Sequence, residues 1–133
     1  MKLRAQVEGL AIPATFAAVL AKDTIVSITA DRTVNAAGAN AIPIGRTFVP
    51  AKEADGTGTV ETRFKELVEV KASGAVAAGD IVKMAAVDPV TGESRVTKWT
   101  GQTDAVAGDK PETRYGVCWK GGADGATLEV LTY

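Results

Sequence analysis

Alternating apolar and polar residues mark the middle of the chain, where residues 59–71 read TVETRFKELVEVK. Valine, threonine and phenylalanine occupy one parity of this run and charged residues the other, which is typical of a β-strand with one buried face. The alternation slips at Glu66 and Leu67, which predicts a bulge or a bend because one extra residue re-phases a strand. Thirteen extended residues span roughly 40 Å, more than the diameter of a domain of this size. The strand must therefore bend, or one end must project as an arm.

Shorter β-type runs separated by turn residues follow residue 24. Besides 59–71, the segments expected to form strands are residues 24–29, 46–49, 80–87, 94–99, 114–120 and 126–133. Asp55-Gly56 and the sequence DPVTGE at 88–93 are strong turn signals. About seven short strands with little helical sequence predict an all-β fold, a small β-barrel or sandwich. Only residues 14–21, preceded by Pro13, have the alanine and leucine content of a short helix.

The segment before the first convincing strand differs from the rest of the chain. Residues 1–22 are apolar and contain Gly9 and Pro13, so we predict an extended N-terminal arm at 1–22 and a single β domain at 23–133. Residues 27–48 and 69–84 share a strand, an AAG turn and a second apolar strand. An internal duplication explains this similarity, and so does the high frequency of alanine and glycine in the chain.

Composition and charge argue against several classes of function. The 133 residues suit one domain and carry 15 Lys and Arg against 16 Asp and Glu, a net charge of −1. Without excess positive charge, dedicated nucleic-acid binding is not expected. The chain has no histidine, the commonest general base and zinc ligand, so hydrolytic and metal enzymes are disfavoured and no cofactor is predicted.

The single cysteine, Cys118, cannot form an internal disulfide. We predict that it is a small core side chain of a protein made in a reducing cytoplasm, with a reactive thiol as the alternative.

Aromatic residues make up 5% of the chain, so the core is expected to be built of small side chains that self-association helps to stabilise. The most apolar run, residues 10–21, is shorter than the roughly 20 residues of a membrane-spanning helix, and no membrane partner is expected.

Motifs for catalysis or ligand binding do not emerge. The glycines within 116–125 lack the spacing of a phosphate-binding loop, and the loop carboxylates lack the spacing of a calcium loop. Trp99 and Trp119 are of a type that stacks on sugars or bases, but packing in a core or subunit interface explains two isolated tryptophans better. This inventory favours a structural or binding protein over an enzyme.

The second half of the chain resembles a known family. It has AGDIV at 78–82, a TGE hairpin turn at 91–93, Gly-Val at 116–117 and a terminal strand with Leu-Glu-Val at 128–130. This order of elements over 71–133 is similar to that of the capsid decoration (cement) proteins of tailed bacteriophages, such as the lambda head decoration protein. The resemblance implies a non-enzymatic virion protein, made in the host cytoplasm, on the outer capsid surface. It implies a homotrimer, with a dimer as the alternative, that binds the expanded shell and clamps neighbouring major capsid proteins.

Two sets of residues are candidates for contacts under this interpretation. Leu10, Ile12, Phe16 and Leu20 would bind the capsid or a neighbouring subunit, the alternative being that they pack on their own barrel. Tyr115 or Trp119 would lie near a subunit contact, because aromatic residues favour interface centres.

Other functions stay open at this point. The chain could be another virion component, such as a tail tube or head-completion protein. It could also be a free-standing β-sandwich module that binds carbohydrate, although the polar loop at 101–112 has no aromatic residue.

Overall fold

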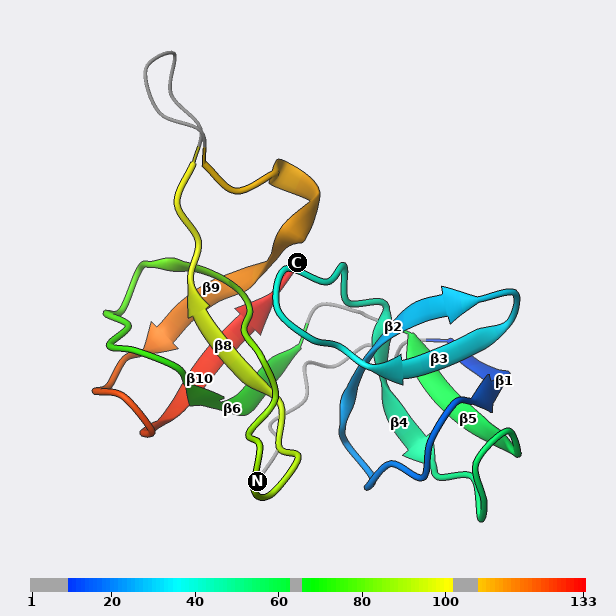
Figure 1. The fold of residues 1–133 in the computed structure, drawn as a ribbon. Helices are drawn as coiled ribbons and strands as arrows, with labels where there is room; N and C mark the ends of the chain where they lie inside the picture. Colours follow the sequence, from blue (N-terminus) through cyan, green and yellow to red (C-terminus); the bar gives the residue numbers. More distant parts are fainter. Residues whose placement is uncertain (1–9, 63–65, 102–107) are drawn as a thin grey trace.

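The chain folds into two five-stranded β-barrels that lie side by side, as the computed structural model in Figure 1 shows. The structure describes residues 10–62, 66–101 and 108–133. The first barrel consists of β1 (Ala11–Phe16), β2 (Ile25–Ala30), β3 (Thr33–Ala36), β4 (Gly45–Val49) and β5 (Thr57–Thr62). The second consists of β6 (Leu67–Ala72), β7 (Ile81–Met84), β8 (Arg95–Lys98), β9 (Arg114–Lys120) and β10 (Thr127–Thr132), with a 3-10 turn, η1 (Pro111–Thr113), before β9. The prediction of an all-β fold is confirmed.

Both barrels have the same topology. In the first, β1 pairs in parallel with β3 and antiparallel with β5, and β2 and β4 complete the ring. In the second, β6 pairs in parallel with β8 and antiparallel with β10, and β7 and β9 complete the ring. Strands β1 to β5 are therefore equivalent, in order, to strands β6 to β10.

The equivalence of the barrels extends to single hydrogen bonds. The Thr62 N–H donates to the Leu10 carbonyl at 2.8 Å, and the Thr132 N–H donates to the Glu66 carbonyl at 2.9 Å. In both cases the threonine hydroxyl donates to the same carbonyl. Leu10 and Glu66 are thus equivalent residues, each at the start of a repeat.

Matching irregularities occur in the two barrels as well. An extra residue forms a bulge in β4 at Phe48 and in β9 at Trp119. Gly45 and Gly116 occupy equivalent positions before these bulges, and a Cβ at either would collide with a backbone carbonyl oxygen of the facing strand, β5 or β10. Shared topology, hydrogen bonds and bulges show that the fold is internally duplicated.

The duplication joins different segments from those that the sequence suggested. Residues 27–48 cover β2 to β4, whereas residues 69–84 cover β6 and β7, which are equivalent to β1 and β2. The similar sequences therefore do not occupy equivalent strands. The two AAG turns lie at different places in the two barrels: residues 36–38 come at the end of β3, whereas residues 77–79 lie between β6 and β7. The equivalent segments begin at Leu10 and Glu66.

The structure divides the chain differently from the predicted arm and single domain. Residues 11–16, expected in the arm, form β1, because Ala14 and Phe16 point into the first barrel's core. The helix considered for 14–21 is absent from these described residues, since β1 runs to Phe16 and Ala17 still donates a backbone hydrogen bond to Val34. Residues 1–9 lie outside the described residues.

The alternating run at 59–71 supplies two strands in place of one. Strand β5 ends at Thr62 and β6 begins at Leu67, so the predicted break at Glu66 and Leu67 lies at the boundary between the barrels. Residues 63–65 of this run lie outside the described residues. Division of this run and the additional strands β1 and β3 bring the number of strands in the described residues to ten, against the predicted seven or so.

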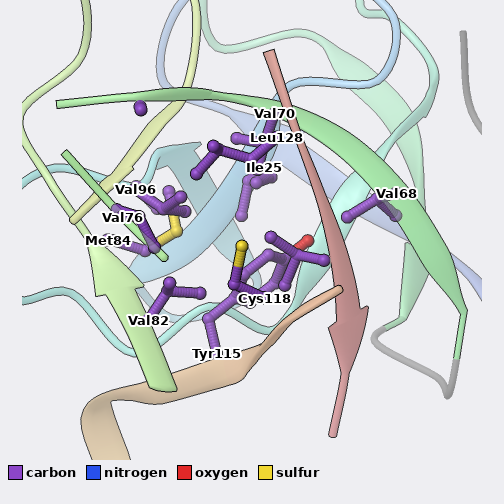
Figure 2. Close-up of a cluster of buried hydrophobic side chains, with 13 residues drawn as sticks. Ile25, Val68, Val70, Val76, Val82, Met84, Val96, Tyr115, Cys118 and Leu128 are labelled. Atoms are coloured by element: carbon purple, nitrogen blue, oxygen red, sulfur yellow. The ribbon is translucent and has the colours of Figure 1, made fainter. Parts of the chain in front are cut away.

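The two barrels share a core at their junction. Ile25 and Ala37 of the first barrel belong to the second barrel's cluster of buried side chains, and Figure 2 shows Ile25 beside Val70 and Leu128. The Ile25 N–H donates to Ser94 Oγ at 3.1 Å, and further backbone and side-chain bonds join Asn40 to β7. The barrels therefore pack as one unit.

Candidate interaction surfaces

The structure places the predicted capsid-binding residues in the first barrel. Phe16 is fully buried in its core, and Ile12 and Leu20 pack against that core. Leu10 is 71% exposed. Phe16 therefore packs on its own barrel, Ile12 and Leu20 are partly buried, and Leu10 lies at the surface. Contact of these residues with a capsid stays a prediction.

The two aromatic candidates for a subunit contact have different environments. Tyr115 is buried in the second barrel's core. Trp119 is 64% exposed in the bulge of β9 and borders an apolar hollow with Val117, Leu131 and Tyr133. Trp119 keeps the exposure that a contact residue needs, whereas Tyr115 contributes to the fold.

A buried ion cluster connects the barrels. Arg46, on β4, lies with its guanidinium facing Glu66 at the start of the second barrel: Nε and Nη2 donate to the two carboxylate oxygens at 3.0 and 3.1 Å. Arg46 Nη2 also lies 3.4 Å from Glu61 Oε2, and Nη1 bonds to the half-exposed Asp23. Arg46, Glu61 and Glu66 are all buried. This paired geometry is the arrangement that buried charges require.

Sequence reasoning missed the ion cluster. Arg46 was assigned to a short strand at 46–49, where an isolated charge normally faces solvent. Its burial depends on the second barrel, which covers the outer face of β4. The sequence does contain one sign of the cluster. The alternation of residues 59–71 is interrupted at Glu66, where a charged residue stands at a position that the pattern assigns to the buried, apolar face.

A cavity of about 460 Å³ lies beside the ion cluster, between the barrels. Both barrels line it, and its charged lining residues are of both signs: Lys22, Asp23, Arg46, Glu69, Lys71 and Glu93. Such mixed charges suit bound water and ion pairing within the junction.

In the described part of the chain, no group of three His, Cys, Asp or Glu residues is placed to hold a metal ion. No helix among those residues is long and apolar enough to cross a membrane.

Four of the described titratable side chains, those of Asp80, Asp88, Asp109 and Cys118, have shifted pKa values. Backbone N–H groups of Thr91 and Val90 lower the pKa of Asp88. Burial, with a smaller contribution from the charge of Asp80, raises the pKa of the Cys118 thiol, so the predicted inert core cysteine is confirmed in its burial. The Ala77 N–H holds the pKa of Asp80 below its usual range. A hydrogen bond from Lys83 does the same for Asp109. The aspartates accept hydrogen bonds that stabilise turns and loops, and Asp80 lies close enough to Cys118 to affect its pKa.

A solved phage structure has the same fold. The chain is similar to the crystal structure of the head fiber gp8.5 N base in bacteriophage phi29, with a TM-score of 0.59 and 14% sequence identity over 93% of each chain. No family model matches the sequence, and no curated protein matches it. At this identity the likeness shows a common fold, which extends over both barrels.

Proposed function

We propose that the chain is a structural protein of a tailed-phage virion that binds the outer surface of the head. The observation that carries this proposal is the fold shared with the N base of a phage head fiber over 93% of both chains. The similarity of residues 71–133 to capsid decoration proteins supports the same location through separate features, namely short turn and strand motifs. We propose no catalytic activity.

The proposed mechanism is preferential binding to the expanded shell. A protein that binds one state of a shell and not the other stabilises the bound state by its binding free energy, about 2.7 kcal/mol per site at a free concentration of 100 Kd. Many copies add their contributions, so modest affinity at each site is sufficient. The proposed partner is the major capsid protein, and the proposed form is a homotrimer.

The duplicated fold suits a clamp. Two barrels of equal topology, fixed together by the Arg46 cluster and by Ile25, form a unit with two similar modules. One such unit can bridge two neighbouring subunits without the loss of conformational entropy that ordering a flexible linker would cause. The exposed apolar residues Leu10 and Trp119 are available for contacts of this kind.

Mixing the purified chain with expanded and unexpanded heads of the phage that encodes it tests the proposal. We expect saturable co-sedimentation with expanded heads, weak or no co-sedimentation with unexpanded heads, and a higher melting temperature of the decorated expanded heads. Equal binding to both kinds of head would refute the clamp mechanism. Absence of binding to either would refute the location on the head.

A further inference from the structure

The internal repeat identifies a surface of the second barrel that lacks its expected cover. In the first barrel, three outward-facing neighbours on β2, β4 and β5 are buried against the second barrel: Ile25, Arg46 and Glu61. We call them the inserting row. The pairing registers make their equivalents in the second barrel Ile81, Val117 and Leu131. In that row Leu131 is 42% exposed, and the other two are only partly buried.

The first barrel has the converse feature. Four buried residues of the second barrel adjoin the inserting row: Glu66 pairs with Arg46, Val68 and Tyr115 line a cavity together with Ile25 and Arg46, and Met84 belongs to the same buried cluster as Ile25. We call them the receiving surface. Their equivalents in the first barrel are Leu10, Ile12, Ile28 and Ile44, of which Ile28 is 64% exposed and the others are partly or largely exposed. One end of the molecule thus has an uncovered inserting row, and the other an uncovered receiving surface.

The residue types at these uncovered ends match each other. Inside the chain, Arg46 of the row pairs with Glu66 of the receiving surface. At the equivalent positions the uncovered row has Val117 and the uncovered receiving surface has Leu10. The charged pair Arg46–Glu66 within the chain thus corresponds to an apolar pair at the two uncovered surfaces, with Val117 on the row and Leu10 on the receiving surface. This is the chemistry expected if each end is covered by the opposite end of another copy, since two apolar residues bury well together and a lone charge does not.

We propose that the chain self-associates head to tail, with the row Ile81, Val117 and Leu131 of one copy seated on the receiving surface around Leu10 of the next. The contact repeats between chains the junction that the two barrels form within a chain. Such a heterologous contact produces a closed ring when its rotation closes and a filament when it does not. The inference rests on the internal repeat and does not depend on binding to a phage head.

Substitutions that introduce the charges of the Arg46–Glu66 pair at Val117 and Leu10 test the proposed contact between chains. Val117→Arg and Leu10→Glu each introduce one member of the Arg46–Glu66 pair, so each single variant buries an unpaired charge at every contact between chains. The double variant recreates the pair at every contact. Val90→Arg is the matched control, because Val90 is 91% exposed in a turn and belongs to neither surface. Sedimentation velocity from about 1 to 100 µM, a range that covers micromolar affinities, measures association without any capsid.

We expect the wild-type chain and Val90→Arg to associate equally. Each single variant should bind at least about 100-fold more weakly, which corresponds to about 2.7 kcal/mol. The double variant should regain affinity to within about tenfold of wild type and become sensitive to salt. Near-ultraviolet circular dichroism checks that each variant is folded, and Leu10→Glu changes an exposed side chain.

Three outcomes would overturn the inference. They are a wild-type chain that stays monomeric throughout this range, single variants that associate like wild type, and a double variant as weak as the single variants. A monomeric wild-type chain would also result if another part of the same chain covered the receiving surface. None of these results bears on co-sedimentation with heads, so this inference and the proposed function fail separately.

Discussion

Removing Arg46 should destabilise the fold strongly, because its guanidinium pairs with a buried carboxylate of each barrel. Arg46→Ala removes the guanidinium that pairs with the buried carboxylates of Glu61 and Glu66. Loss of one partner from a buried pair typically costs 3–5 kcal/mol. The adjoining cavity admits water and Asp23 is half-exposed, so we expect the lower value, about 3 kcal/mol.

Urea denaturation followed by circular dichroism measures this loss. With a slope of about 2 kcal/mol per molar, the midpoint should fall by about 1.5 M. Arg32→Ala, at an exposed arginine, is the control and should change stability by less than about 0.5 kcal/mol. A triple variant, Arg46→Val with Glu61→Leu and Glu66→Leu, installs the residues of the equivalent positions Val117, Leu131 and Leu10.

The triple variant should be about as stable as the wild type or more stable, because apolar replacement of a whole buried ion cluster is often neutral or favourable. A loss below about 1 kcal/mol for Arg46→Ala would show that the cluster is solvated and not a buried junction. A triple variant as unstable as Arg46→Ala would contradict the residue equivalence between the barrels.

Other consequences of the structure are open to simple measurements. Gly116→Ala should lower stability by about 1–3 kcal/mol, because its Cβ collides with the backbone of β10, whereas Gly38→Ala, in open space, should change calorimetric stability little. Because burial raises the pKa of Cys118, a thiol reagent at pH 8 should label the native chain far more slowly than the urea-unfolded chain; equal rates would contradict the assignment. Since Lys83 lowers the pKa of Asp109, this carboxylate stabilises the fold above its unfolded pKa of about 3.9, and the benefit disappears as the pH falls through the lower folded value. Urea midpoints of wild type and Asp109→Asn should therefore differ at pH 7 and converge toward pH 2; a constant difference would exclude this linkage.

Local patterns in the sequence were sufficient for the strands and turns of the second barrel. The runs 80–87, 94–99 and 114–120 and the turn at 88–93 are local signals, and each contains or matches an observed element. The core position of Cys118 followed from its residue type. These features depend on neighbours close in sequence, which is why they could be predicted.

Features that depend on the pairing of distant residues could not be predicted in the same way. Residues 11–16 lack strong alternation and contain Pro13, so their pairing with β5 becomes visible only in the closed barrel. An internal duplication was considered, but with the wrong segments, because the loops differ in length between the barrels and the alanine-rich turns resemble each other. The burial of Arg46 depends on the neighbouring barrel, and nothing adjacent to it in sequence signals that contact.

Imaging of decorated heads by electron cryo-microscopy tests the central claim most directly. The account predicts, on expanded heads incubated with the purified chain, added density of paired small barrels on the outer surface, touching more than one major capsid subunit, with little such density on unexpanded heads. Maps in which the outer surface of expanded heads stays bare, or in which the paired barrels lie elsewhere in the particle, would contradict it.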